Sequence, residues 1–440
     1  MFSKYVQWRL ERYIKKYFKK YHPILIAVVG SVGKTTTKMA IGTALASNFR
    51  VQLETENHNT PLSVPLAIMG IKYPPYELVH SVKTWRQVFK AMRQRINAPQ
   101  GVDVIIQELG TDHPGDLAVF KKYLRPDIAV VTSVSPEHME NFPGGLADVA
   151  KEELSVASFA DYTIVNHDDI DSDFAQYADT TNLTDYGIEG GEYRLEITGG
   201  SPLAGYQVNF YTPESGSQVA ASTTLHLVGN HMLKAALAAF VVGSRLNVPM
   251  TTQMANLSQI TPVSGRMNVL AGRSGAVLLD DTYNSSPVAA IAALKTLYQI
   301  PAPQRIAILG SMNELGAYSA EAHKQVGQFC DPMMLDWVLT IGDQANQYLA
   351  PAAEKRGCQV RAFTDPVSAG TFANLMLKKG AVVLIKGSQN NVFAEEATKI
   401  LLDNSEDRNK LVRQGDYWMN KKVDWFAKVH HQTDGSLDEE

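Results

Sequence analysis

The sequence predicts an α/β protein made of two successive sheet domains. Short apolar runs alternate with amphipathic segments, a Gly-rich turn "GSVGKT" directly follows the first run, and a second alternating set begins after a linker at residues 261–266. Alternation of strand and helix patterns is typical of mostly parallel sheets covered by helices. We therefore expect a phosphate-loop central domain with a mostly parallel sheet, followed by a Rossmann-like C-terminal α/β domain.

The central domain is expected over residues 23–263. Apolar runs rich in branched residues predict buried parallel strands, and apolar residues at helical spacing predict helices. Residues 190–228 differ, because their short runs separated by turns predict a small antiparallel section. The other expected elements are strands at Ile24–Val29, Val51–Glu54, Val102–Leu109, Ile128–Ser133 and Tyr162–Asn166, and helices from Lys34, at Tyr76–Ile96, Pro114–Leu124, Ala147–Ala160 and Met232–Leu246.

The C-terminal domain is expected over residues 264–420. Residues 421–440 end in acidic and small residues, which predicts a loose tail. The second set of α/β elements is expected at Val277–Leu279, Val288–Leu297, Arg305–Leu309, 319–329, Trp337–Ile341 and Ala381–Lys386.

Composition narrows the class of protein. The chain has 440 residues, of which 45% are hydrophobic and 20% charged, as in globular proteins. The formal net charge of −4 gives no general attraction to nucleic acid. The two cysteines, Cys330 and Cys358, exclude a disulfide framework and a four-cysteine zinc site, and favour a reducing compartment. Since no apolar run has membrane-spanning length and no secretory signal is evident, we expect a cytoplasmic protein.

Residues 1–22 form a basic amphipathic pattern. They contain seven lysines and arginines but only one acidic residue, Glu11, so the remainder of the chain carries a net charge of −10. Apolar and aromatic residues recur at helical spacing through this segment. Two interpretations stay open: the helix lies on an anionic membrane surface, or its apolar stripe docks on the acidic body of the protein.

The turn after the first strand has the chemistry of an anion site. Gly30, Ser31 and Gly33 form a loop that presents backbone N–H groups, and Lys34 adds a point charge. The hydroxyl of Thr35 is placed to hold Mg²⁺, with Thr36 following in the same helical turn. Ala27 replaces the usual first glycine, so only the G-x-x-G-K-T part of the phosphate-loop pattern is intact.

Eight short motifs are spaced along the chain. They are "GSVGKTTTK" at 30–38, "ENHNTPLSVP" at 56–65, "ELGTDHPGDL" at 108–117, "SPEHMENF" at 135–142, "SGRMNV" at 264–269, "DDTYNSSP" at 280–287, "LGSMNELG" at 309–316 and "KGS" at 386–388. In this order they resemble the Mur ligase family, in detail most like its D-alanyl-D-alanine-adding members. The resemblance covers about residues 23–400, and it implies ATP-dependent amide formation through an acyl phosphate, in peptidoglycan precursor synthesis.

The resemblance implies ATP and Mg²⁺ as cofactors. Lys34 and the loop amides would hold the triphosphate, Thr35 and Glu108 would bind one Mg²⁺, and His138 would contact a second ion. Two cations suit this chemistry, because a carboxylate must approach an anionic phosphoryl group. Several relatives also carry a carbamylated lysine near the metal. "AKEEL" at 150–154 matches that motif with Lys151 as the lysine, and we expect Lys151 at the metal site, while a competing alignment places Glu153 there.

In the second domain, the resemblance implies that Arg266 reaches the ATP phosphates when the domains close. Asp281 and Asn284 match positions that contact the nucleotide, and Lys386 and Ser388 match groups that receive substrate. Closure of this kind would exclude water from a reactive acyl phosphate.

The motifs say less about the acceptor, the substrate whose carboxylate is activated, than about the nucleotide. Asn57 and Asn59 match the segment that meets a muramyl peptide, yet only 22 residues precede the first strand, where typical D-alanyl-D-alanine-adding members have a UDP-binding domain. The resemblance implies small-molecule substrates, namely a muramyl peptide and either D-Ala-D-Ala or another amine. Lipid-linked, poly-glutamate or folate-type acceptors, and a degenerate non-catalytic scaffold, remain as alternatives.

Overall fold

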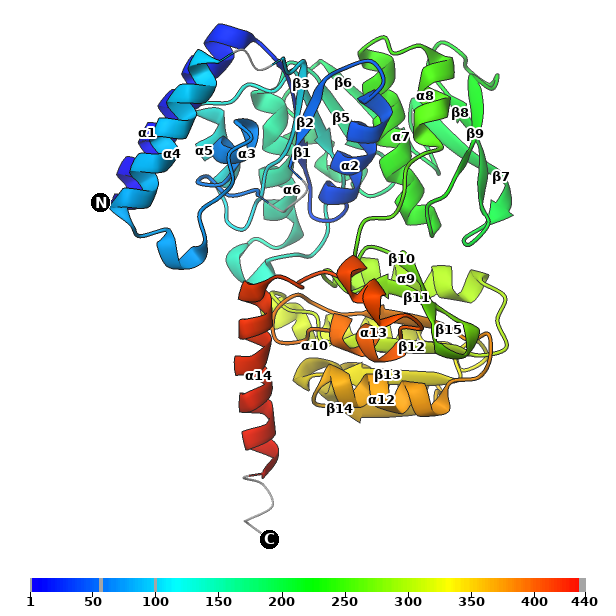
Figure 1. The fold of residues 1–440 in the computed structure, drawn as a ribbon. Helices are drawn as coiled ribbons and strands as arrows, with labels where there is room; N and C mark the ends of the chain where they lie inside the picture. Colours follow the sequence, from blue (N-terminus) through cyan, green and yellow to red (C-terminus); the bar gives the residue numbers. More distant parts are fainter. Residues whose placement is uncertain (1, 55–57, 99–100, 435–440) are drawn as a thin grey trace.

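The computed structural model describes residues 2–54, 58–98 and 101–434. Two sheets, each covered by helices, lie one above the other in Figure 1, and the chain crosses once from the upper to the lower unit. The predicted α/β class, with a phosphate-loop domain followed by a second α/β domain, is confirmed. Within the described ranges, no helix is both long and apolar enough to cross a membrane.

The upper sheet has nine strands in the order β2-β3-β1-β4-β5-β6-β7-β8-β9. Pairing is parallel from β2 to β7 and antiparallel from β7 to β9, so the predicted antiparallel section continues the main sheet. The strands are β1 (Ile24–Val29), β2 (Val51–Leu53), β3 (Val104–Glu108), β4 (Ile128–Val131), β5 (Thr163–Asn166), β6 (Leu183–Gly187), β7 (Tyr193–Ser201), β8 (Gly205–Tyr211) and β9 (Ala221–Leu225).

Helices cover both faces of this sheet. Ile26 and Val28 of β1 face one apolar core and Leu25 and Val29 face the other, which explains why the strand is apolar throughout. The first core contains α2, α7 and α8, and the second contains α1, α3, α4 and α5. The helices of this unit are α1 (Phe2–Tyr21), α2 (Lys34–Leu45), α3 (Val64–Ile68), α4 (Val82–Asn97), α5 (Asp116–Lys121), α6 (Leu146–Leu154), α7 (Asn230–Arg245) and α8 (Met250–Leu257).

The lower sheet has six strands in the order β10-β11-β15-β12-β13-β14, and only the β10–β11 pair is antiparallel. Its strands are β10 (Asn268–Gly272), β11 (Ala276–Asp281), β12 (Arg305–Gly310), β13 (Trp337–Ile341), β14 (Val360–Phe363) and β15 (Val382–Lys386). Its helices are α9 (Pro287–Gln299), α10 (Ser319–Phe329), α11 (Ala350–Lys355), α12 (Pro366–Met376), α13 (Glu395–Leu401) and α14 (Asp416–Asp434).

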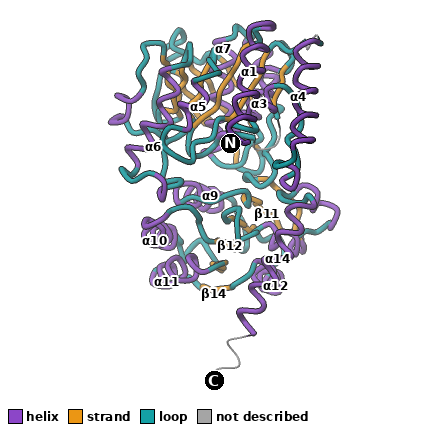
Figure 2. The backbone as a smooth tube through the Cα atoms, turned by 90° about the vertical axis from the view of Figure 1, so that its left-hand side faces the viewer, coloured by secondary structure: helices purple, strands orange, loops and turns teal. Residues whose placement is uncertain are grey.

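The C-terminal segment differs from its prediction. The expectation of a loose tail is wrong for residues 421–434, which continue α14; residues 435–440 lie outside the described ranges. Lys422 is buried and forms ion pairs with Glu395 (2.8 Å) and Glu396 (2.6 Å), and Trp425 packs edge-on against Phe393. These contacts fix the first turns of α14, whose far end extends beyond the lower unit (Figures 1 and 2).

Helix α4 begins later than predicted. Its first residue is Val82 and not Tyr76, because the side chain of Ser81 accepts a hydrogen bond from the Thr84 amide and caps the helix there. Similarly, α6 ends at Leu154, and a short 3₁₀ turn replaces the rest of the predicted helix.

Candidate active site

A cavity of about 1420 Å³ lies between the two units. Its upper wall is formed by the loops that follow β1, β3, β4 and β5, and its lower wall by the segment before β10 and the segments after β11, β12 and β15. Because β1 lies between β3 and β4, the carboxyl end of β1 is a point where strand order reverses. Ligands of open α/β sheets bind at such points.

The loop after β1 has the conformation of an anion cradle. Gly30 and Gly33 have φ angles of 122° and 90°, which side chains other than glycine rarely adopt. A Cβ atom on Gly30 would also lie 2.3 Å from the Thr132 hydroxyl, so glycine is required there on steric grounds. Ser31 is fixed to the neighbouring loop, since its hydroxyl accepts from the Ser135 amide at 3.0 Å.

Lys34 and the threonines after it lie at the start of α2. The Lys34 ammonium donates to the carbonyl oxygens of Gly30 and Ser31, the latter at 3.0 Å, and so it folds over the loop. Thr35 and Thr36 are buried and line the cavity. Loop amides, a lysine and a helix start together provide the donors that a phosphate group needs.

The Thr35 hydroxyl contacts two residues that the sequence predicts at the active site, one from each unit. It donates to Glu108 Oε2 at 3.2 Å and accepts from Arg266 Nη2 at 2.9 Å. The other oxygen of Glu108 pairs with the Lys38 ammonium at 2.8 Å, and both side chains are almost fully buried. The structure therefore brings the strand-end carboxylate, the loop threonine and the arginine of the second domain together.

This donor set fits a small divalent cation bound with a nucleotide. No group of three His, Cys, Asp or Glu side chains in the described ranges is arranged to hold a metal ion. Mg²⁺ is usually held by one or two protein oxygens together with phosphate oxygens and water. Thr35 and Glu108 provide such oxygens beside the cradle.

The Arg266 guanidinium is oriented by an aromatic ring and has a buried donor that can bind an anion. Its guanidinium carbon lies 4.1 Å from the centroid of the Tyr283 ring, which fixes the plane of the group. Its Nε atom is buried and has no hydrogen-bond partner among the described residues. A buried, unpaired donor is costly, and a phosphate oxygen would satisfy it.

His138 lies where the two units meet. It has a φ of 50°, and its ring nitrogens lie 3.4 Å from Asp112 Oδ1 and 3.2 Å from Glu314 Oε2. Glu314 belongs to the second unit, so His138 links the units across the cavity. Its imidazole is therefore placed between two carboxylates at the rim of the cavity that the phosphate loop lines.

The expectation that Lys151 faces the active site is wrong. Lys151 is exposed and lies in a separate surface depression, whereas Glu153 is 1% exposed and lines the main cavity. Residues two apart on a helix point in directions about 200° apart, so only one of the two can face the loop. Glu153 does so, as in the competing alignment.

Glu153 is a buried carboxyl in contact with the phosphate loop. It accepts from the Gly30 amide at 2.8 Å and from the Thr111 hydroxyl at 2.6 Å. Burial raises the pKa of Glu153 to about 7, although Lys34 and these two hydrogen bonds act in the opposite direction. The pKa of Glu137, which also lines the cavity, is raised chiefly by burial.

The second unit contributes a buried lysine. Lys386 at the end of β15 donates to Asp281 Oδ2 at 2.7 Å and to the Asn284 carbonyl at 2.9 Å, and all three residues line the cavity. Ser388, the other residue that the motifs assign to substrate, does not line the cavity. Ser388 is fully buried outside the cavity lining, and its hydroxyl accepts from the Asn313 amide at 2.9 Å.

Of the two residues expected on the acceptor side, Asn59 lines the cavity. Asn57 lies outside the described residues. Several cavity residues were not identified from the sequence. One indication of their role is present in the sequence: each lies within or next to one of the eight motifs. Their side-chain directions could not be derived from the sequence. These residues are Thr111, Asp112, Glu137, Tyr283 and Glu314.

Two family models match the chain. One, described as the Mur ligase middle domain, matches residues 28–243, and another, described as "Mur ligase, glutamate ligase domain", matches residues 265–389. Together they cover most of the chain and correspond to the upper and lower units.

Individual relatives are more distant. UDP-N-acetylmuramoyl-tripeptide–D-alanyl-D-alanine ligase of Haemophilus influenzae is 27% identical over 385 residues, covering 84% of this chain and 75% of its own. The Bacillus subtilis ligase of the same name is 23% identical over 404 residues, covering 90% and 79%.

A solved structure has the same fold. MurF from Acinetobacter baumannii superposes with a TM-score of 0.73 at 22% identity, covering 90% of this chain and 80% of that one. The fold, a phosphate-loop domain followed by a mostly parallel C-terminal sheet domain, is thus shared with this structure. The chain belongs to the Mur ligase family, whose members are ATP-dependent acid–amino-acid ligases.

Proposed function

We propose that this Mur ligase adds D-Ala-D-Ala to a muramyl-peptide precursor in peptidoglycan synthesis. The observation that carries the proposal is the contact between Arg266 and Thr35, because it joins the two units at the phosphate loop. The names of the curated relatives supply the substrate class. Retention of Lys34, Thr35, Glu108 and His138 favours a working enzyme over a non-catalytic scaffold.

In the first step, an oxygen of the peptide carboxylate attacks the γ-phosphorus of ATP and ADP leaves. Lys34, the loop amides and Arg266 balance the negative charge that moves onto the bridging and terminal oxygens. Bound at Thr35 and Glu108, Mg²⁺ would neutralise phosphate charge and orient the oxygens.

In the second step, the amine nitrogen attacks the acyl carbon, the bond from that carbon to the phosphate oxygen breaks, and inorganic phosphate leaves. The nitrogen loses a proton as the amide forms. Glu153, which is held beside the loop by Gly30 and Thr111, has a pKa close to neutrality and is placed to exchange a proton within the cavity. Closure of the two units around the substrates would exclude water from the acyl phosphate.

The test is a product assay with UDP-muramyl-tripeptide, D-Ala-D-Ala, ATP and Mg²⁺, read by ADP release and by the mass of the product. The proposal predicts ADP release that needs both substrates, together with the pentapeptide product. Lys34→Ala should remove turnover, and the exposed Lys379→Ala should leave it unchanged. ADP release only with a folate-type, poly-glutamate or lipid-linked acid would overturn the substrate assignment, and no turnover with any acceptor would favour the scaffold.

A further inference from the structure

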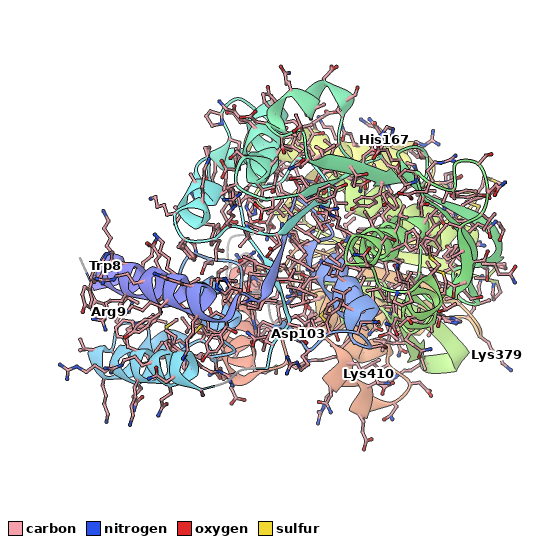
Figure 3. The ribbon with its side chains drawn as sticks, turned by 90° about the horizontal axis from the view of Figure 1, so that it is seen from above. Trp8, Arg9, Asp103, His167, Lys379 and Lys410 are labelled. Carbon is pink, nitrogen blue, oxygen red and sulfur yellow. The ribbon has the colours of Figure 1, made fainter. Side chains whose placement is uncertain are left out.

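Helices α1 and α4 form one layer on the outside of the upper unit. Figure 3 shows them side by side, with Trp8 and Arg9 near the outer end of α1. The Arg9 guanidinium lies 5.1 Å from the centroid of the Phe89 ring, and near the other end the Tyr21 hydroxyl donates to the Ile96 carbonyl at 2.7 Å. The two helices therefore run in the same direction.

The inner face of this layer is apolar. Five residues of α1 are buried in the same core as four residues of α4, and these contacts account for the helical stripe in the sequence. Of the two interpretations of residues 1–22, the one in which the apolar stripe docks on the body of the protein agrees with these contacts. The partner, however, is the apolar face of α4, itself a basic helix, and not an acidic surface. The α1 residues are Val6, Leu10, Tyr13, Ile14 and Tyr17, and the α4 residues are Trp85, Val88, Phe89 and Met92.

The outer face of the layer is strongly positive. Helix α1 contains seven lysines and arginines and α4 contains five, against a single acidic residue, Glu11. Ten of the twelve basic residues are exposed, and we call them the basic platform. They are Lys4, Arg12, Lys15, Lys16, Lys19, Lys20, Lys83, Arg86, Lys90 and Arg93.

Apolar groups are exposed at one end of this platform. Tyr5 and Trp8 of α1 are 50% and 46% exposed, and Val82 at the start of α4 is 53% exposed. The Arg12 guanidinium lies 4.8 Å from the centroid of the Trp8 ring. Because the helices run in the same direction, these groups belong to the same end of the layer.

We propose that the basic platform docks on an anionic lipid bilayer, with Trp8 and its apolar neighbours entering the headgroup region. A helix of 20 residues is about 30 Å long, so α1 presents its lysines along a line that a flat surface can meet at once. Lysine and arginine near an anionic surface attract it, and Trp and Tyr favour the interface between lipid and water.

Two other occupants fit less well. A second copy of the chain would place one positive face against another, which like-charge repulsion disfavours. Nucleic acid would match the charge, but the apolar groups are gathered at one end of the layer and are not interleaved with the lysines as stacking platforms are. The lipid proposal does not depend on the proposed reaction, and it is tested without turnover.

The experiment is co-sedimentation of the full chain with vesicles containing about 30 mol% phosphatidylglycerol in phosphatidylcholine, compared with phosphatidylcholine alone. We expect binding to the anionic vesicles only, decreasing as salt rises from about 0.05 M to about 0.5 M. The triple variant Lys15→Glu, Lys16→Glu, Lys19→Glu should bind on the order of 100-fold more weakly, since each lost basic residue is worth roughly fivefold.

The matched control is Lys355→Glu, Arg356→Glu, Lys379→Glu, which changes the same charge at exposed positions of the lower unit. It should bind vesicles like the unchanged protein. Equal loss in both triple variants, equal binding to neutral vesicles, or no binding at all would overturn the proposal. Binding of duplex DNA or single-stranded RNA without vesicle binding would also overturn it and assign the platform to nucleic acid.

A second readout is Trp8 fluorescence, taken as the difference between the unchanged protein and Trp8→Phe. Entry into the headgroup region predicts a blue shift of this difference spectrum on adding anionic vesicles. Unchanged emission with full co-sedimentation would contradict the placement of Trp8 at the membrane. An unaltered melting temperature in each variant verifies that the exposed substitutions leave the fold intact.

Discussion

The Arg266 guanidinium donates to the Thr35 hydroxyl at 2.9 Å, although the two residues are 231 positions apart in the chain and belong to different units. This contact places a fixed cation of the second unit beside the phosphate loop of the first. Charge that develops on a transferring phosphoryl group is stabilised most by donors already in position. Arg266 is therefore expected to contribute directly to the rate of phosphoryl transfer.

Arg266→Lys is expected to lower kcat by roughly 10²-fold or more, because lysine keeps the charge but loses the planar donors and the stacking on Tyr283. Steady-state ADP release and a melting curve would measure this. Wild-type kcat in the folded variant would show that the contact belongs to a resting conformation and has no part in turnover.

Lys34→Ala should abolish amide formation, with a rate loss of roughly 10² or more, because the lysine supplies positive charge at the phosphate loop. The fold should survive, since the Lys34 ammonium donates to two loop carbonyls at the cavity and is not part of either apolar core. Circular dichroism and product analysis test both parts, and normal turnover in a folded variant would remove the ATP site from this loop.

Glu153→Gln is expected to be far less active than Lys151→Ala, because Glu153 contacts the loop and Lys151 is exposed outside the cavity. Ligase turnover of the two purified variants measures the order. The reverse order would restore Lys151 as the functional residue and show that α6 is rotated in the working enzyme.

The raised pKa of Glu153 also predicts how the free energy of unfolding changes with pH. Its folded-state pKa of about 7 lies above the ordinary glutamate pKa of 4.5, so between these values the folded state binds more protons than the unfolded state. Its contribution to the free energy of unfolding is present at low pH and is lost as pH rises through about 7. The melting temperature of Glu153→Gln relative to the unchanged protein should therefore increase between about pH 5 and about pH 8. A constant or decreasing difference would contradict the burial.

Leu10→Ala should lower the free energy of unfolding by about 2–5 kcal/mol, because Leu10 is fully buried where α1 joins the body. Lys16→Ala on the outer face should change it by less than about 0.5 kcal/mol. Denaturant unfolding of both variants is the measurement. Equal small effects would mean that α1 is not part of the folded core.

The sequence was sufficient for the fold because its strongest patterns are local. The six apolar residues of β1 and the glycines after it determine a buried strand and its turn. Thr35, Glu108 and Arg266, which the motifs identified, lie in contact at one cavity. Patterns of this kind depend on spacing along a strand or helix, which can be read without knowing the neighbouring elements.

Other features depended on packing and could not be read in this way. Lys151 and Glu153 stand two residues apart in one helix, and only the face of α6 that meets the phosphate loop decides which of them is functional. Ser388 occurs in a matching motif, but its hydroxyl is used by the Asn313 amide. The residues of α14 lack a strong apolar pattern that would predict a packed helix. Lys422 is buried because its ammonium forms an ion pair with the buried Glu395 carboxylate.

The central claim is ligation through an acyl phosphate in the cavity between the two units. Its most direct measurement uses a muramyl-tripeptide whose terminal carboxylate carries oxygen-18, with analysis of the phosphate released during amide formation. Our account predicts that one labelled oxygen passes from the carboxylate to each phosphate, since the bond between the acyl carbon and that oxygen is the one that breaks. Amide formation that yields unlabelled phosphate would contradict it.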